Sequence, residues 1–168
     1  MTSAPELRGP RVVLAPVQPA HHERLREIHR LPEVSRWWKE PAADWPSADP
    51  DTVAYAVVLD DRVVGFAQWY QESDPEYRHA GIDLFLDGAV HGQGLGTEVV
   101  RLLATHLVDE RGFHRLVIDP EAANSAAIAC YRRVGFRDVG VMREYCRGAD
   151  GGWRDGLMMD LLARELIR

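Results

Sequence analysis

His91-Gly-Gln-Gly-Leu-Gly-Thr97 separates a β-rich run, Ile82–Leu86, from Leu95–Arg111, whose apolar residues recur on one face of a helix. Alternate glycines let successive backbone N–H groups turn toward one point without side-chain clashes. The helix that follows adds free N–H groups and the positive end of its dipole. The segment is therefore typical of a loop that binds a phosphate or a diphosphate. A plain tight turn between strand and helix is the alternative.

This segment does not match the sequence motifs of two well-known phosphate-binding loops. A P-loop ends in Gly-Lys-Ser/Thr, whereas Gly96-Thr97 contains no lysine. A dinucleotide-binding fingerprint has the form G-x-G-x-x-G; Gly92 and Gly94 match its first two glycines, but Thr97 stands where the third is required. That fingerprint also lies in the first strand-helix-strand unit of a chain. Here at least three predicted strands precede the loop. The sequence therefore predicts a phosphate site of another kind.

Outward from the loop, β-rich runs alternate with helical patterns. Ala20–Leu31 predicts a helix, and Ser35–Asp51 predicts a short helix followed by a long loop. Asn124 is placed to cap a helix over residues 125–133 that Gly135 ends. The order predicts an α/β (α+β) fold in which helices cover both faces of one mixed sheet. The other predicted strands are Val12–Leu14, Leu116–Ile118, Val139–Tyr145, Gly156–Leu162, and Tyr55–Leu59 with Val63–Tyr70 as a hairpin.

The composition is that of an ordinary globular protein. With 168 residues, 46% of them hydrophobic and 27% charged, we expect a single domain over residues 1–168 that needs no metal or disulfide to fold. No apolar run reaches the ~20 residues of a membrane span, and the first residues lack the apolar core of a signal peptide. Cys130 and Cys146 form no Cys-x-x-Cys pair. These features predict a cytoplasmic protein with reduced cysteines and no membrane partner.

Acidic residues concentrate in one part of the chain. The net charge of −6 argues against a general nucleic-acid-binding protein, which presents a basic face. Residues 40–83 hold ten acids and only two bases, Arg62 and Arg78. A concentrated negative field raises the local concentration of cations in a cleft. On this fact alone a solvated acidic surface is the simpler interpretation, and a site for a cationic ligand is the alternative.

Two motifs resemble one known superfamily. His91–Thr97 is similar to the acetyl-CoA pyrophosphate loop of the Gcn5-related N-acetyltransferase (GNAT) superfamily, R/Q-x-x-G-x-G/A. Gly94 and Gly96 match this form, and His91 stands where Arg or Gln is usual. Asn124–Phe136 resembles the N-x-x-A-x-x-x-Y-x-x-x-G-F segment of the same superfamily. The resemblance implies a mostly antiparallel central sheet with helices on both faces, and acetyl-CoA as the co-substrate.

Shorter segments are similar to the aminoglycoside 6'-N-acetyltransferases of this superfamily. That similarity implies acetyl transfer to a primary amine of a cationic small molecule, with antibiotic resistance of a bacterium as the result. Related enzymes that acylate siderophore precursors or other metabolite amines share several of the segments, and they remain the alternative. The segments are Ser35-Arg-Trp-Trp38, Gly65-Phe-Ala-Gln-Trp-Tyr70, Gly81-Ile-Asp-Leu84, Gly92-Gln-Gly-Leu-Gly-Thr97 and Asp119-Pro120.

Asp83 lies in an apolar run, where an unpaired carboxylate is seldom buried. It is either part of a structural ion pair with Arg78 or Arg115 or, as the resemblance implies, the acidic residue at the acceptor amine. Reference pKa values of ~3.9 for Asp and ~10.4 for an alkylammonium differ by ~6.5 units, or ~9 kcal/mol. Desolvation that raises the pKa of the acid and lowers that of the amine reduces this gap. We therefore expect Asp83 to orient the amine and to accept its proton as the carbonyl is attacked.

As the resemblance implies, Tyr131 is expected to be the proton donor to the departing coenzyme A thiolate. A phenol with a reference pKa of ~10 donates to a thiolate whose conjugate acid has a pKa of ~8.5 at a cost of only ~2 kcal/mol. A core aromatic residue on a helix is the alternative.

The resemblance also implies the binding residues. A backbone N–H between Leu84 and Leu86 is expected to face the thioester oxygen. Three tryptophans in the irregular acidic stretch, Trp37, Trp38 and Trp45, suit the wall of an acceptor cleft because they stack on sugar rings. Acceptor residues are expected to be Trp37, Trp38, Gln68, Tyr70, Asp83 and Asp119, with Asp150 as a further anchor. Cofactor residues are expected to be Phe85, Leu86, His91, Gly92, Gln93, Gly94, Leu95, Gly96, Thr97 and Asn124, the last also as a helix cap.

No metal is expected, because the seven histidines show no His-Glu-x-x-His or other zinc spacing. Cys130 is expected to be a core residue and not a nucleophile, so acetyl transfer would proceed by direct attack in a ternary complex. A non-catalytic acyl-CoA-binding module is the alternative from another class of protein. The chain is expected to act as a monomer or a homodimer, without a nucleic-acid partner.

Overall fold

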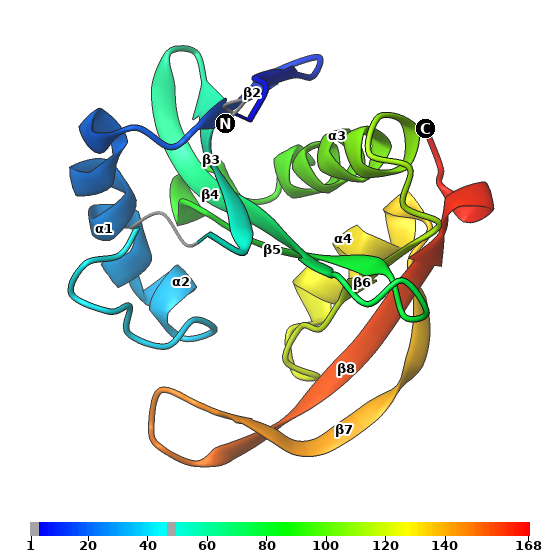
Figure 1. Ribbon diagram of the computed structural model, residues 1–168. Helices are drawn as coiled ribbons and strands as arrows, with labels where there is room; N and C mark the ends of the chain where they lie inside the picture. The colour runs from blue at the N-terminus through cyan, green and yellow to red at the C-terminus, as the bar shows by residue number, and fades with distance from the viewer. Residues whose placement is uncertain (1–3, 47–49) are drawn as a thin grey trace.

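The computed structural model describes residues 4–46 and 50–168 (Figure 1). In this part of the chain, eight strands form one sheet in the order β1-β2-β3-β4-β5-β6-β8-β7. Neighbouring strands are antiparallel except β5 and β6, which are parallel. The predicted mixed, mostly antiparallel sheet is confirmed. The strands are β1 (Leu7–Arg8), β2 (Val12–Pro16), β3 (Thr52–Leu59), β4 (Arg62–Glu72), β5 (His79–Leu86), β6 (Arg115–Ile118), β7 (Arg137–Arg147) and β8 (Trp153–Leu162).

Helices cover both faces of the sheet, as the order of elements predicts. They are α1 (His22–Arg30), α2 (Pro32–Ser35), α3 (Leu95–Asp109) and α4 (Ser125–Val134). In Figure 1, α1 and α2 lie on one face, and α3 and α4 lie on the other. The connection between β4 and β5 and the one between β3 and β4 are short, so these strands form a continuous antiparallel unit at the centre of the sheet.

Each helix pair packs on its own apolar cluster. Leu25 and Ile28 of α1 are fully buried against Phe66 and Phe85, which project from β4 and β5 on that face. The larger cluster joins the buried face of α3 and α4 to the other side of the sheet. The alternation of side chains along β5 therefore divides its residues between two separate cores.

The element boundaries differ from the prediction near the N-terminus. The helix predicted over Ala20–Leu31 begins at His22, because residues 19–21 form a 3-10 turn. The short helix predicted within Ser35–Asp51 lies earlier, over Pro32–Ser35, because Pro32 suits the first turn of a new helix. Of the long loop predicted after it, residues 47–49 lie outside the described residues. β1 was not predicted, since two residues carry no alternating pattern. The predicted hairpin turn is confirmed by positive φ angles of 48° and 61° at Asp60 and Asp61.

β5 and β6 separate soon after they meet. They pair only where Ala80 faces Leu116 and Gly81 faces Val117. β5 continues to Leu86, paired with β4 along its whole length. Beyond Gly81, the edge of β5 that faces β6 has no strand partner in the described sheet. The two strands therefore diverge and leave backbone groups available at the centre of the molecule.

Candidate active site

A cleft of about 690 Å³ lies beside the diverging edge of β5. Its walls come from the end of β5, from α2 and the residues after it, from the loop before α3, and from α4. Of the residues predicted to bind the cofactor, Gln93 alone does not line the described cleft. The others all do: Phe85, Leu86, His91, Gly92, Gly94, Leu95, Gly96, Thr97 and Asn124, together with the predicted acid Tyr131.

The glycine loop presents free backbone donors to this cleft. Gly92 and Gly94 have φ angles of 75° and 77°, and Gly94 is the N-cap of α3. A Cβ at Gly92 would meet nothing within 4 Å, so the backbone conformation and not a lack of space requires glycine there. The N–H groups from Gly92 to Thr97 have no backbone acceptor among the described residues. This arrangement suits an anion at the N-terminus of α3.

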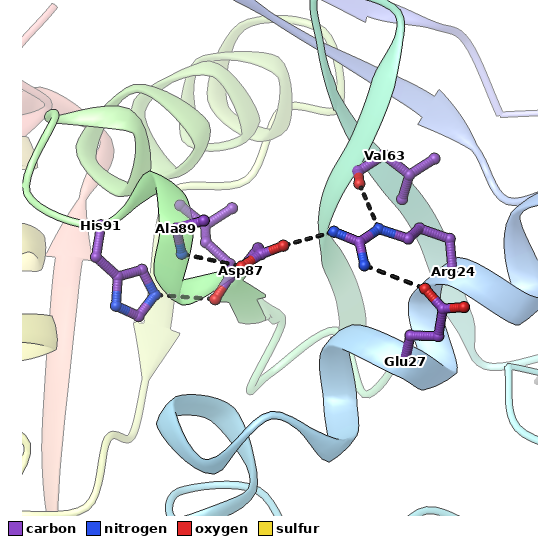
Figure 2. A network of polar contacts seen from close by, with 7 residues as sticks. Arg24, Glu27, Val63, Asp87, Ala89 and His91 are labelled. Carbon is purple, nitrogen blue, oxygen red and sulfur yellow. Dashed lines mark hydrogen bonds and ion pairs between the residues drawn. The ribbon is translucent and has the colours of Figure 1, made fainter.

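Polar side chains connect the start of this loop to α1, as Figure 2 shows. His91 Nε2 lies 2.9 Å from the carbonyl oxygen of Leu86. Buried Asp87 accepts hydrogen bonds from the Ala89 N–H at 2.9 Å and from Arg24 of α1 at 2.6 Å. The end of β5, the start of the loop and helix α1 are therefore held in one network.

The backbone of β5 alternates between its two neighbours. The Asp87 N–H donates to the Val64 carbonyl at 2.7 Å, so the odd-numbered residues of this stretch face β4. Leu84 and Leu86 therefore direct their backbone groups to the open side, where the resemblance implies a donor to the thioester. Phe85 also lines the cleft, although its backbone faces β4.

α4 contributes Asn124 and Tyr131. Asn124 Oδ1 accepts from the Ala127 N–H at 3.3 Å and also lines the cleft, so both predicted roles are compatible. Tyr131 is buried, 7% exposed, and lines the cleft. Burial raises the pKa of Tyr131, so its hydroxyl keeps the proton at neutral pH.

Cys130 is not the plain core residue that was expected. It packs against the core, yet it is half-buried and lines the cleft. The Thr97 hydroxyl donates to its sulfur at 3.3 Å. Burial raises the pKa of the Cys130 thiol, which is the opposite of what a nucleophilic cysteine requires.

Asp83 has no ion-pair partner among the described residues. Its Oδ2 accepts a hydrogen bond from Gln68 Nε2 at 3.0 Å. The alternative of a structural ion pair is wrong, because Arg78 donates to the carbonyls of residues 111 and 112 and Arg115 pairs with Asp160. Burial raises the pKa of Asp83 by more than the Gln68 hydrogen bond lowers it. The carboxylate is therefore a stronger base than a solvated aspartate.

Four further polar side chains form a chain of contacts that begins at Asp83. Gln68 and Tyr70 come from β4, Asp119 follows β6, and Tyr145 comes from β7. Burial, with the nearby carboxylates of Asp83 and Asp119, raises the pKa of Tyr70 to about 12. The Tyr145 hydroxyl donates to Asp119 Oδ2 at 2.5 Å. Tyr70 lies across Gly81, where an added Cβ would be 2.1 Å from its ring. We call Gln68, Tyr70, Asp83, Asp119 and Tyr145 the acceptor cluster.

The acceptor cluster and the cleft share no residue, but they are adjacent along β5. None of the five cluster residues lines the cleft itself, whereas Leu84, Phe85 and Leu86 do. Asp83 directly precedes these three residues, and it contributes to the raised pKa of Tyr131. The predicted base and the predicted acid are therefore close enough for their charges to interact, although only the acid lines the cleft.

The tryptophans divide between wall and core. Trp37 and Trp38 line the same cleft as the predicted cofactor residues, and not a separate cleft beside the acceptor cluster. Trp45 packs on Phe66 with ring centroids 5.1 Å apart, and Trp38 packs edge-on against Phe85 at 5.0 Å. Trp45 is thus part of the apolar cluster under α1 and does not line the described cleft.

Asp150 is bound within its own hairpin turn. It accepts from Arg154 Nη2 at 2.5 Å and from the Gly152 N–H at 3.0 Å. Those contacts lower the pKa of Asp150, and its carboxylate is bound within the turn.

Within residues 4–46 and 50–168, no group of three or more His, Cys, Asp or Glu is arranged to hold a metal ion. Among the helices of the same residues, none is long and apolar enough to cross a membrane.

Several residues of the site carry no local sequence signal. Tyr145 belongs to an irregular, exposed strand, and only the tertiary fold brings it to Asp119. Arg24 and Asp87 belong to no motif in the sequence and resemble ordinary surface charges. The other lining residues that were not predicted are Glu33, Val34, Arg36, Val90, Ser125, Ala126, Ala127, Ala129, Cys130 and Arg133.

Comparison with known proteins points to one family. Residues 20–136 match the family described as the acetyltransferase (GNAT) family. An aminoglycoside N(6')-acetyltransferase type 1 of Klebsiella pneumoniae is 33% identical, over 72% of this chain and 69% of that protein. A crystal structure of an aminoglycoside acetyltransferase in complex with coenzyme A is 27% identical, with a TM-score of 0.75 over 92% of this chain and 96% of that one.

Relatives named for other acceptors also match. A [ribosomal protein bS18]-alanine N-acetyltransferase of Escherichia coli is 37% identical, over 47% of this chain and 52% of that protein. Similarity in sequence therefore extends to proteins whose named acceptor is a protein.

Proposed function

The chain belongs to the acetyltransferase (GNAT) family, and within it we propose that this enzyme acetylates a primary amine of a cationic small molecule of the aminoglycoside class. Acetyl-CoA is the co-substrate. Resistance to such an antibiotic would follow from the loss of the positive charge on the modified amine. The expected single domain, cytoplasmic location and monomeric or dimeric state remain predictions.

One observation carries the choice of acceptor. Asp83 and Asp119 both belong to the acceptor cluster, and neither has an ion-pair partner among the described residues. Two carboxylates without a cation beside a cleft favour a ligand that brings its own positive charges. The relatives named for aminoglycosides support the same chemical class. A peptide N-terminus brings a single ammonium group, so it uses this pair of carboxylates less well.

The described residues fit coenzyme A. The free amides from Gly92 to Thr97 suit its diphosphate, and the open edge of β5 at Leu84 and Leu86 suits an extended amide-containing arm. Bound acetyl-CoA supplies an acetyl group activated as a thioester. Leu84 and Leu86 offer backbone donors toward that group at the open side of β5.

Asp83 and Tyr131 have complementary proton roles in this proposal. Asp83, with its raised pKa, orients the ammonium and holds the proton that the amine loses during attack. Tyr131 stays protonated because burial raises its pKa, and it donates to the sulfur that leaves. Cys130 has a raised pKa as well, so direct attack of the amine is favoured over an acetylated cysteine.

An acceptor panel tests the proposal. Release of the free coenzyme A thiol is followed with aminoglycosides bearing a 6'-amine, matched aminoglycosides with a 6'-hydroxyl, siderophore-type amines and an alanine-terminated peptide. We expect turnover with the 6'-amines, and mass spectrometry should locate one added acetyl group. Preferred turnover of the peptide or of a metabolite amine would overturn the choice of acceptor. Coenzyme A binding without turnover of any amine would favour a binding module.

A further inference from the structure

Arg11, in the turn before β2, connects that turn to the loop before α3. Its Nη1 donates to the Gln93 carbonyl at 2.8 Å, and its Nε donates to Glu98 Oε2 at 2.8 Å. The backbone N–H groups of Arg11 and Val12 donate to Glu98 Oε1 at 2.6 and 2.9 Å. Gly9 leaves room for this carboxylate, since an added Cβ would lie 3.0 Å from Glu98 Oε1. Four hydrogen bonds therefore hold two segments that are distant in the sequence.

Glu98 creates a problem at this end of α3. It is buried, 8% exposed, in the first turn of the helix whose N-terminus faces the cleft. A negative charge there reduces the attraction of the helix N-terminus for an anion. Burial by itself would raise the pKa of Glu98, but the hydrogen bonds from Arg11 and Val12 and the charge of Arg11 together lower it. Glu98 is therefore ionised, and Arg11 is the cation that compensates it.

The contact with Gln93 also sets the direction of a donor. A trans peptide is planar, so the Gly94 N–H points opposite to the Gln93 carbonyl. That carbonyl points at Arg11, which does not line the cleft, whereas Gly94 does. The hydrogen bond from Arg11 thus turns the Gly94 N–H away from Arg11. The left-handed conformation of Gly94, with φ of 77°, permits this orientation.

We propose that Arg11 is a positioning residue for the diphosphate of coenzyme A: it orients the Gly94 amide through the Gln93 carbonyl, and it neutralises Glu98 at the N-terminus of α3. The inference rests on the proposed role of the loop His91–Thr97 as the diphosphate site. Arg11 acts through this loop and not on the thioester or the amine. Its removal therefore weakens only ligands that carry the diphosphate.

The test compares coenzyme A with pantetheine, which has the same thiol arm and no diphosphate. Binding of each is measured by isothermal titration calorimetry to the wild-type protein and to Arg11→Ala. The variant keeps both backbone bonds to Glu98, so we expect it to fold. Its affinity for coenzyme A should fall roughly tenfold or more, because charge-assisted hydrogen bonds are lost. Its affinity for pantetheine should stay within about twofold of wild type, because pantetheine does not reach the loop.

Two further variants separate this role from general effects. Arg8→Ala removes the same charge from β1, where Arg8 forms an exposed ion pair with Glu6, and it should leave both affinities unchanged. Arg11→Ala combined with Glu98→Gln removes both charges, and it should regain part of the affinity for coenzyme A. If Arg11→Ala does not fold, Arg11→Lys keeps the charge without the fork that holds Gln93 and Glu98 together, and it replaces Arg11→Ala in the comparison.

The outcomes are distinct. Equal losses for coenzyme A and pantetheine, or a loss for coenzyme A no greater than that of Arg8→Ala, would overturn the role of Arg11. No recovery in the double variant would overturn the compensation of Glu98. A wild-type protein that does not bind coenzyme A would overturn the proposed function together with this inference, whereas binding that is insensitive to Arg11→Ala overturns the inference alone.

Discussion

The two halves of the proposed site, one for the cofactor and one for the acceptor, are built in different ways. In the proposed cofactor half, backbone amides from Gly92 to Thr97 and the open edge of β5 are the available donors. In the acceptor half, side chains from β4, β5, β7 and the end of β6 form the acceptor cluster. Recognition by backbone groups depends on a short sequence motif, whereas recognition by side chains depends on the register of strands that are distant in the sequence. The second half can therefore change its ligand while the first is kept.

Tyr131→Phe should have the largest effect. It tests whether Tyr131 of α4 donates the proton to the leaving thiolate, where the cofactor half meets the acceptor half. We expect kcat to fall about a hundredfold, because a general acid contributes ~10²–10⁴-fold, with the KM of acetyl-CoA little changed. Steady-state kinetics measure both constants. Tyr55→Phe, a buried tyrosine outside the cleft, is the matched control and should keep full turnover. Full turnover of Tyr131→Phe would remove its role as the acid.

Asp83→Asn should come next, with an effect confined to the acceptor half. Turnover should fall roughly tenfold to a hundredfold, because Asn cannot accept the proton of the amine. In the wild type, the raised pKa of Asp83 predicts that kcat/KM for the amine falls as the pH drops through this pKa, because the carboxylate becomes protonated. The pH profile of the variant should lack that fall. Turnover that matches wild type at every pH would end this assignment.

Gly94→Ala tests the cofactor half alone. A non-glycine residue with a φ of 77° is strained by ~1–2 kcal/mol, so the loop should lose its donor geometry. The KM of acetyl-CoA should rise roughly tenfold with the KM of the amine unchanged. Gly112→Ala carries a similar strain, with φ of 69° and open space around it, in the turn after α3. It should cost similar stability and leave both KM values alone.

Gly81→Ala is the counterpart in the acceptor half. Its Cβ would lie 2.1 Å from the Tyr70 ring, so the ring must move out of the acceptor cluster. We expect the KM of the amine to rise a few-fold and the KM of acetyl-CoA to stay constant. A raised KM of acetyl-CoA in Gly81→Ala would contradict the division into two halves. Equal changes in both KM values in Gly94→Ala would contradict it as well.

The smallest effect concerns stability. Because the pKa of Asp83 is raised in the folded state, the folded protein binds this proton more tightly than the unfolded chain, and stability decreases as the pH rises through that window. Asp83→Asn should therefore raise Tm slightly at neutral pH, with no gain below pH ~4, where the unfolded aspartate is also protonated. The pKa of Asp150 is lowered, so Asp150→Asn should shift Tm in the opposite direction. Thermal denaturation at several pH values measures both.

Much of the cofactor half was predictable because its signals are local. Gly92 and Gly94 adopt the positive φ angles for which glycine is suited, and Asn124 caps α4 as its position suggests. The long amphipathic helix and the Asp60-Asp61 turn were predictable for the same reason. Helix boundaries near Pro32 were not, because proline both ends one helix and starts the next.

The amino-acid sequence by itself determined the glycine loop before α3, the segment that carries Tyr131 and the presence of an unusual aspartate in an apolar strand. Those features depend on backbone conformation and on neighbours within a few residues. The tertiary structure alone decided that Asp83 meets Gln68 and not an arginine, that Tyr145 reaches Asp119, and that Arg11 binds Gln93. Each of these contacts joins different elements, so its existence depends on strand register and helix placement, which only the packed core sets.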